Sequence, residues 1–165
     1  MVESSEKGMK ALSFQQPYAT EIMLGVKTIE CRTRKVKTPI KNLVVCSSKT
    51  ANAFYPIPGL AYGFAMALVD VVDCVPFTKK HLDAADMEEM PAKESYAWIL
   101  ENPKPIKPFS VHASASFFYV QDDIIPVTIE TANDYQKLYD KIYNSKIDKD
   151  NGATPEDVIA GFFED

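Results

Sequence analysis

The stretch Lys27–Arg32 contains the side chains of this sequence that are best suited to chemistry. In a strand, where successive side chains point to opposite faces, Thr28, Glu30 and Arg32 share one face, across from an apolar row. An arginine can bind phosphate or a guanine edge through two parallel hydrogen bonds, and a carboxylate can accept from an exocyclic amine of a base. Arg32 and Glu30 are therefore candidates for contacts to a nucleotide, and neither contact requires a metal or a cofactor.

The same residues allow a second interpretation, in which Lys27 and Glu30 form a catalytic pair. Glu30 would be the general base that activates water, and Lys27 would stabilise the developing oxyanion. A third interpretation is an ion pair of Glu30 with Arg32 or Lys27 that has no function. Geometry separates the first two interpretations. Catalysis needs Glu30 and Lys27 to converge on one substrate atom in a closed pocket, whereas a binding module needs an open groove lined by Arg32, Lys35 and Lys49.

A strand, a short helix and a second strand are predicted to position these residues, over Leu12–Arg32. Residues 12–14 alternate in polarity as a half-buried strand does, and Pro17 suits the first position of a helix. Gly25 stands where a left-handed helix end is expected, and the second strand opens at Thr28. The chemistry is therefore expected on a strand that follows directly on a helix.

This stretch resembles the ASCH (activating signal cointegrator homology) domain family, whose fold is PUA-like. The matching pattern is Ser-x-x-Gln-Pro-(Tyr/Trp)-Ala, then Gly-x-Lys-Thr, then Ile-Glu-x-Arg. Its residues here are Ser13, Gln16, Pro17, Tyr18, Ala19, Gly25, Lys27, Thr28, Ile29, Glu30 and Arg32. Weaker similarity extends to about residues 9–120. The resemblance implies an α+β domain over that range, a mixed or antiparallel PUA-like β-barrel with peripheral helices.

The resemblance also implies a function, which is binding of RNA or a nucleotide in a cleft over the strand Lys27–Arg32. By the same resemblance the predicted strand Leu43–Cys46 borders this cleft. The hydroxyls and lysine that follow this strand could hold a phosphate or a base edge, or they could form an ordinary turn. The expected ligand-binding residues are Gln16, Tyr18, Lys27, Thr28, Glu30, Arg32, Ser47, Ser48 and Lys49.

An enzymatic alternative comes from a small bacterial branch of the family that this chain resembles around Gly-x-Lys-Thr. That branch hydrolyses the amide of N4-acetylcytidine with a lysine, a threonine nucleophile and a glutamate. Lys27 matches the lysine, Glu30 stands at the nucleophile's position, and Asp86 or Glu88 could stand in for the glutamate. Other members resemble ribonucleases. The alternative function is therefore a hydrolase of a modified nucleoside or RNA, with Lys27 and Glu30 as its catalytic pair.

Length and composition predict one domain, because 165 residues with 46 % apolar content can bury about two thirds of the unfolded surface. The polar N-terminal residues do not resemble a signal peptide, and no apolar run reaches the ~18 residues of a membrane span. We therefore expect a cytoplasmic protein with no membrane partner. Cys31, Cys46 and Cys74 have spacings that fit neither a disulfide framework nor a zinc site, so we expect buried, reduced thiols.

Charge is distributed unevenly along the chain, whose net charge is −5. Residues 27–49 contain seven basic residues and one acid, which gives this segment +6 and the rest of the chain −11. A local basic segment favours recognition of an anion over non-specific binding along a polymer, although a solvated basic loop would have the same pattern. Residues 121–165 are acidic, and their apolar residues at helical spacing predict a helical C-terminal extension packed on the barrel.

The remaining elements are predicted from periodicity and from turn signals. A long strand is expected over Tyr62–Phe77, with Asp70 and Asp73 on opposite faces and neither of them catalytic. A helix is expected over Lys79–Met90, with His81 as a surface or capping residue. Strands at Ser95–Ile99 and Phe117–Val120, separated by the proline-rich edge or loop Glu101–Phe109, would complete the barrel.

Overall fold

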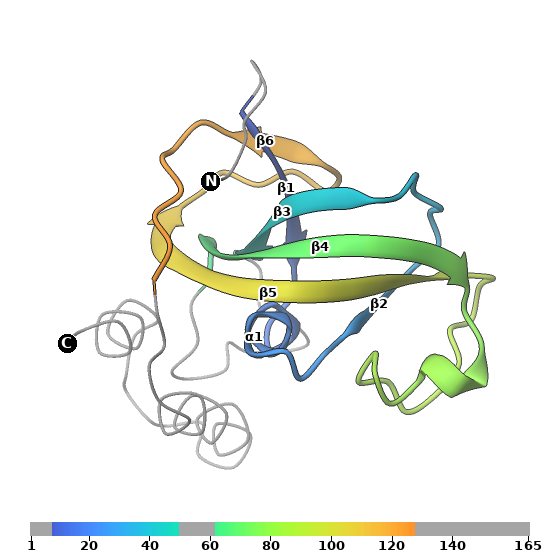
Figure 1. Ribbon diagram of the computed structural model, residues 1–165. Helices are drawn as coiled ribbons and strands as arrows, with labels where there is room; N and C mark the ends of the chain where they lie inside the picture. The colour runs from blue at the N-terminus through green and yellow to red at the C-terminus, as the bar shows by residue number, and fades with distance from the viewer. Residues whose placement is uncertain (1–7, 50–61, 128–165) are drawn as a thin grey trace, which may run out of the picture.

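The protein folds around a single six-stranded sheet with the strand order β2-β5-β4-β3-β1-β6. The computed structural model describes residues 8–49 and 62–127 (Figure 1). Strand β1 pairs with β3 in parallel, and the other neighbours are antiparallel. The elements are β1 (Met9–Phe14), α1 (Tyr18–Leu24), β2 (Ile29–Arg32), β3 (Ile40–Ser47), β4 (Phe64–Pro76), the 3₁₀ turn η1 (Lys79–His81), β5 (Tyr96–Ser110) and β6 (Phe118–Val120).

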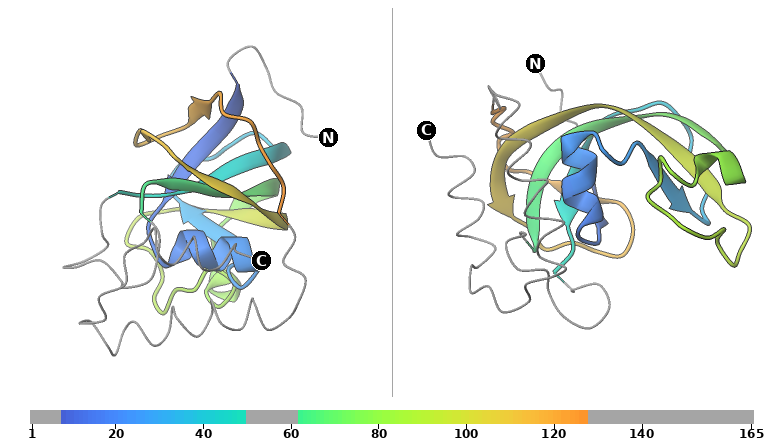
Figure 2. Two further views of the ribbon diagram at one scale, coloured as in Figure 1. Left: turned by 90° about the vertical axis from the view of Figure 1, so that its left-hand side faces the viewer. Right: turned by 90° about the horizontal axis from the view of Figure 1, so that it is seen from below.

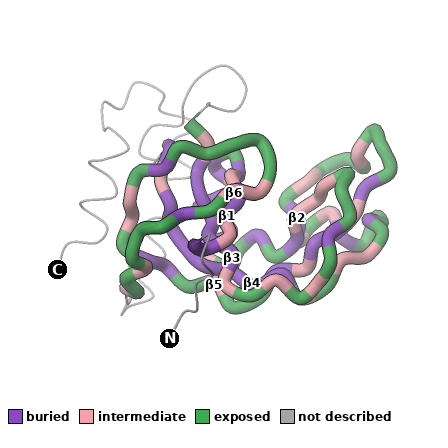
Figure 3. The backbone as a smooth tube through the Cα atoms, turned by 90° about the horizontal axis from the view of Figure 1, so that it is seen from above, coloured by how far each residue is buried: buried purple, intermediate pink, exposed green. Residues whose placement is uncertain are grey.

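The sheet curves around α1, which fills its concave side (Figure 2). Ile22 and Met23 of α1 pack in one core cluster with Trp98 and Val45, whereas Val44 belongs to a second cluster. Alternate residues of β3 thus enter two cores, which explains the continuous apolar run at Leu43–Cys46. Figure 3 shows the result as buried stretches along the strands and exposed stretches in the connecting loops.

The expected β-barrel is not closed in the described part of the chain. β2 and β6 lie at the two ends of the strand order and do not pair with each other. β2 has four residues, all of which pair with β5. The prediction of a mixed, mainly antiparallel sheet with a helix is confirmed, and the prediction of barrel closure is not. The expected C-terminal helices lie outside the described residues, as does the segment 50–61.

Strand β5 is longer than expected and includes the proline-rich segment as far as Ser110. Only its first part lies between two strands, because β2 pairs with residues 96–99 alone. Beyond Ile99 the strand pairs with β4 on one side, and Pro105 and Lys107 bond to residues 125–127 on the other. Proline is tolerated there because the bonds to residues 125–127 use the Pro105 carbonyl and the Lys107 amide, so no donor is needed from a proline.

The helix predicted over Lys79–Met90 is wrong, since only the short turn η1 forms. Asp86 has a φ of 55°, which no α-helix accommodates. The Ala84 carbonyl instead accepts from the amides of Thr28 and Ile29. Tertiary hydrogen bonds to β2 therefore hold this segment, the 82–95 loop. His81 is buried, and its Nδ1 accepts from the Thr78 amide at 2.9 Å, so of the two predicted roles the capping role is confirmed and the surface role is wrong.

Gly25 ends α1 in the left-handed conformation, with φ 77°. The space for a Cβ is open, because the nearest atom is Pro103 Cγ at 3.7 Å. We expect Gly25→Ala to lower the free energy of unfolding by about 1 kcal/mol through backbone strain alone. Urea denaturation measures this loss. Gly25→Asn should cost less, since asparagine tolerates the left-handed region, and equal losses would contradict the explanation.

Asp70 lies on β4 beside two register shifts and holds neighbouring strands together. Its carboxylate accepts from the Asn42 amide at 2.9 Å and from Asn102 Nδ2 at 3.0 Å. Lys41 Nζ lies 3.6 Å away. Burial raises the pKa of Asp70, but these hydrogen bonds and the lysine charges outweigh burial, so that the pKa lies below its ordinary 3.8. These contacts give Asp70 a structural role, which the sequence did not predict.

We expect Asp70→Asn to lower the free energy of unfolding by about 1–2 kcal/mol at pH 7. Because the folded pKa is depressed, the ionised group stabilises the fold above about pH 4. This contribution disappears as the pH falls through the folded pKa. Urea denaturation at several pH values should therefore show wild type and variant converging in acid. A constant difference down to the lowest pH would contradict the assignment.

The three cysteines are free thiols, but only Cys46 is buried, whereas Cys31 and Cys74 are partly exposed. Burial raises the pKa of Cys46 to about 12. The prediction of buried thiols is therefore confirmed for Cys46 and wrong for the other two. No helix in residues 8–49 and 62–127 is long and apolar enough to cross a membrane.

Candidate ligand-binding site

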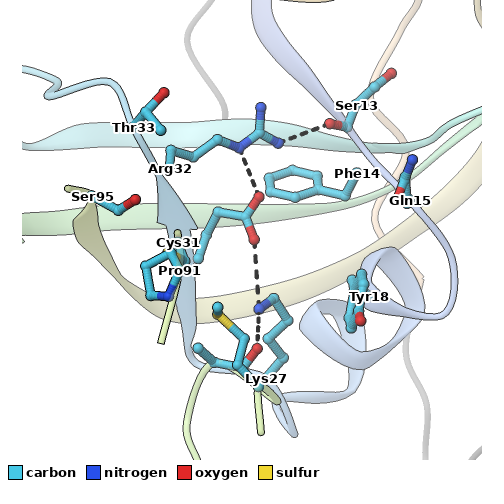
Figure 4. Close-up of a pocket in the computed structure, with 13 residues that line it drawn as sticks. Ser13, Phe14, Gln15, Tyr18, Lys27, Cys31, Arg32, Thr33, Pro91 and Ser95 are labelled. Carbon is cyan, nitrogen blue, oxygen red and sulfur yellow. Dashed lines mark hydrogen bonds and ion pairs between the residues drawn. The ribbon is translucent and has the colours of Figure 1, made fainter. Parts of the chain in front are cut away.

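A pocket of about 580 Å³ opens beside β2 and is lined by residues from three parts of the chain (Figure 4). β2 and the residues beside it contribute Lys27, Glu30 and Arg32, the end of β1 and the start of α1 form a second wall, and the 82–95 loop forms a third. The full lining is Ser13, Phe14, Gln15, Tyr18, Lys27, Glu30, Cys31, Arg32, Thr33, Ala85, Met87, Pro91 and Ser95.

Three charged side chains form a connected cluster in the pocket. Arg32 Nε donates to Glu30 Oε2 at 2.8 Å, and Lys27 Nζ lies 3.5 Å from Glu30 Oε1. Exposure rises along the cluster, from 4 % for Lys27 and 13 % for Glu30 to 27 % for Arg32. The carboxylate therefore lies between two cations, of which Arg32 is the more accessible to a ligand.

Lys27 lies deepest in this cluster and ties the pocket wall to β2. Its ammonium donates to the Ala85 carbonyl in the 82–95 loop. The same ammonium lies 5.2 Å from the centre of the Tyr18 ring, within the range of a cation–π contact. One buried lysine thus contacts the helix, the loop and Glu30 at once.

Aromatic rings support the outer part of the cluster. The Arg32 guanidinium lies 5.3 Å from the centre of the Phe14 ring and 5.8 Å from that of Trp98. Arg32 also donates to the Ser13 carbonyl at 3.1 Å.

Tyr18 contributes a neutral phenol to the pocket. Burial, followed by the charges of nearby acids, raises the pKa of Tyr18, so its phenol stays protonated at neutral pH. The pocket therefore combines ring surfaces with fixed hydrogen-bonding groups.

The cluster keeps hydrogen-bonding capacity for a ligand. A guanidinium has five N–H donors, and the contacts to Glu30 and Ser13 engage one Nε–H and one terminal nitrogen. A carboxylate has about four lone-pair sites, so Glu30 can accept further N–H groups beyond those of its two cations. The site can thus offer an acceptor and a cationic donor to one small planar ligand.

The other predicted binding residues lie outside this pocket. Thr28 is exposed and lines a neighbouring cavity of about 280 Å³ under α1. Gln16 is fully buried, and its Oε1 accepts from the amide and the hydroxyl of Thr20. Ser47 is also fully buried, and its hydroxyl bonds to the Phe64 backbone. Ser48 and Lys49, at the end of β3, are not among the pocket residues.

Sequence reasoning missed most of the pocket wall. Ser13 is the serine of the motif, and Phe14 and Gln15 lie between it and Gln16, so all three could have been identified from the motif. Met87 and Pro91 carried no signal, because they reach the pocket through long-range contacts of the 82–95 loop. The basic side chains that follow β2 do not converge there either, since Lys35 is exposed and is not among the lining residues.

Comparison with known proteins places this arrangement in a family. The ASCH domain model matches residues 12–110, a range that includes α1, β2, the 82–95 loop and all of β5. The chain belongs to the ASCH domain family. No curated protein matches the chain. Within residues 8–49 and 62–127, the ASCH domain has no group of three or more His, Cys, Asp or Glu side chains that could hold a metal ion.

Solved structures of an ASCH protein from Zymomonas mobilis resemble this ASCH domain. One has 15 % sequence identity and a TM-score of 0.49, and the match covers 84 % of this chain and 96 % of that chain. A serine-to-alanine mutant of the same protein has 14 % identity and a TM-score of 0.47, with 70 % and 90 % covered. A tyrosine-to-phenylalanine mutant has 16 % identity and a TM-score of 0.46, with 68 % and 90 % covered.

Proposed function

We propose that this ASCH domain binds one nucleotide unit, as part of RNA or free, in the pocket of Lys27, Glu30 and Arg32. The observation that carries this proposal is the half-buried carboxylate of Glu30, fixed between two cations in a pocket with aromatic walls. Its volume of about 580 Å³ falls in the range of about 300–1,000 Å³ that is usual for small-ligand sites.

Glu30 determines which bases fit this pocket. A carboxylate only accepts hydrogen bonds, so it pairs with an exocyclic amine and opposes a carbonyl oxygen at the same place. Cytosine carries such an amine at the position where uracil carries O4. The ligand is therefore a base with an exocyclic amine, held by Glu30, while the remaining donors of Arg32 bind its phosphate or a carbonyl oxygen.

The pocket is not the open groove that we expected of a binding module, so the binding proposed here is of a single nucleotide unit. Lys35 and Lys49, which would line such a groove, are not among the residues of the pocket. Arg32 is its most exposed cation, at 27 %. The pocket itself thus supports recognition of one unit, and contacts to further nucleotides would have to lie outside it.

A second candidate is hydrolysis of a modified nucleoside or RNA by Lys27 and Glu30. The observation in its favour is the 3.5 Å distance between Lys27 Nζ and Glu30 Oε1 inside one pocket. Such a pair meets the first geometric condition for an acid–base site. Lys27 is 4 % exposed and donates to the Ala85 carbonyl, so its ammonium is engaged in the wall of the pocket and binding is the better supported of the two functions.

Calorimetric titration of cytidine 5′-monophosphate against wild type and Arg32→Gln tests the binding proposal. Loss of the charged guanidinium should weaken binding about 10- to 100-fold, because a charge-assisted hydrogen bond is removed. Lys80→Gln, an exposed lysine outside the pocket, is the matched control and should bind like wild type. Equal affinity of Arg32→Gln and wild type would refute the proposal. Release of acetate from N4-acetylcytidine, abolished by Glu30→Gln, would establish the hydrolase instead.

A further inference from the structure

A row of cation and ring contacts leads from the pocket across the sheet to β1 and β6. Arg32 lies 5.8 Å from the Trp98 ring centre, and the Trp98 ring stacks on Phe117 with centres 6.0 Å apart and planes 13° apart. Phe117 in turn contacts Lys10 and Arg34, whose charged groups lie 4.8 Å and 5.4 Å from its ring centre. Two further cations are therefore connected to the pocket's arginine through the stacked rings of Trp98 and Phe117.

The backbone holds both of these cations in place. The indole N–H of Trp98 donates to the Arg34 carbonyl at 2.9 Å, and Trp98 is only 1 % exposed. Lys10 lies inside β1, where it is opposite Tyr119 of β6. Arg34 thus follows β2 on an anchored backbone, and Lys10 reaches the same ring from a different strand.

The charges of Lys10 and Arg34 are not neutralised by described acids. The ion pairs among residues 8–49 and 62–127 involve Glu30 and Asp70, and neither pairs with Lys10 or Arg34. Arg34 is exposed and Lys10 is partly exposed. A cation that lies against a ring keeps its outward N–H donors for a ligand, so this pair can bind an anion.

We propose that Lys10 and Arg34 form a phosphate-binding extension of the pocket, and that the ligand is therefore a single-stranded oligonucleotide. This inference rests on the proposed function, because the chain of the ligand would continue from the nucleotide in the pocket past Trp98 and Phe117. Phe117 packs against Trp98, so its ring holds the two cations and does not serve as a platform for a base. The extension recognises phosphates and carries no sequence information.

The test compares cytidine 5′-monophosphate with hexacytidylate RNA on wild type and on the double variant Lys10→Gln, Arg34→Gln. Wild type should bind the hexamer more tightly than the mononucleotide. The double variant should lose this excess affinity, about tenfold, and keep mononucleotide binding. The slope of log affinity against log salt for the hexamer should become shallower by about 1.4, because each lost phosphate contact to a single strand accounts for about 0.7.

The double variant Lys79→Gln, Lys107→Gln is the matched control, since it removes the same charge from exposed positions away from Phe117. A hexamer that binds no more tightly than the mononucleotide, or an equal loss in both double variants, would overturn the extension and leave the pocket intact. Failure of both ligands to bind would overturn the proposed function itself. Competition by oligoglutamate as effective as that by hexacytidylate would show that the surface is for acidic peptides and refute the oligonucleotide assignment.

Discussion

Glu30→Gln is expected to abolish the preference of the pocket for bases with an exocyclic amine. Wild type should bind cytidine 5′-monophosphate about 5- to 150-fold more tightly than uridine 5′-monophosphate, which corresponds to the usual 1–3 kcal/mol for a correct base contact. A glutamine amide donates as well as accepts, so it pairs with either base edge. In Glu30→Gln the ratio of the two affinities should fall to about one.

The ratio is measured by titrating both nucleotides against both proteins under the same conditions. Glu94→Gln, an exposed glutamate outside the pocket, changes the net charge in the same way and should keep the wild-type ratio. The ratio is insensitive to a partial loss of folded protein, because both ligands report on the same folded fraction. A ratio that Glu30→Gln leaves unchanged would show that Glu30 does not contact the base.

Lys27→Met is expected to cause the largest loss of stability among the pocket substitutions. Lys27 is 4 % exposed, pairs with Glu30 and donates to the Ala85 carbonyl. Methionine leaves that carbonyl without its donor and removes one of the two cations of Glu30. We expect the free energy of unfolding to fall by about 3 kcal/mol, as is usual when one partner of a buried pair is removed. Urea denaturation measures the change.

Two comparisons identify the cause of this loss. Lys93→Met, which replaces an exposed lysine, should change stability by less than about 0.5 kcal/mol. The double variant Lys27→Met, Glu30→Gln should be more stable than the sum of its single variants predicts, because the buried Lys27 ammonium is then not left without its carboxylate. Hydrogen exchange in the 82–95 loop should also accelerate in Lys27→Met. A loss no larger than that of Lys93→Met would mean that Lys27 does not hold the loop.

The centre of the site could be predicted from the sequence because its spacing is local. Glu30 and Arg32 share a face of β2 because side chains alternate along a strand. Lys27 lies between the helix end at Gly25 and the start of β2. The short helix and its left-handed end at Gly25 were predicted for the same reason. These features depend on neighbouring residues and on steric rules that act within a few positions.

The rest of the site depends on contacts between distant parts of the chain. A helix was predicted over Lys79–Met90 from local signals, but the Ala84 and Ala85 carbonyls there accept from Lys27, Thr28 and Ile29. The Ser13 carbonyl that accepts from Arg32 is a backbone group, which no residue type could indicate. Lys49 was expected to follow the strand at Leu43–Cys46, which the resemblance placed beside the cleft; it does follow β3, but it does not line the pocket.

The sequence could not show whether the sheet closes into a barrel, because strand periodicity predicts strands and not their partners. The pattern indicated β1, β3 and β4 in outline, but it could not show that β2 pairs with four residues of β5 alone. The proline-rich part of β5 was expected as an edge or loop, but it is a strand bridged to residues 125–127 on its second side. Its long pairing with β4 follows from tertiary packing, which periodicity does not encode.

The central claim is that a nucleotide binds in the pocket formed by β2, the start of α1 and the 82–95 loop. Titration of cytidine 5′-monophosphate into isotopically labelled protein, followed by amide chemical shifts, tests it most directly. We predict progressive shifts at Tyr18, at residues 27–33 and at residues 85–95, with little change in the remote turn around Asp122. Shifts that are confined to other parts of the protein, or the absence of any shift at saturating nucleotide, would contradict the account.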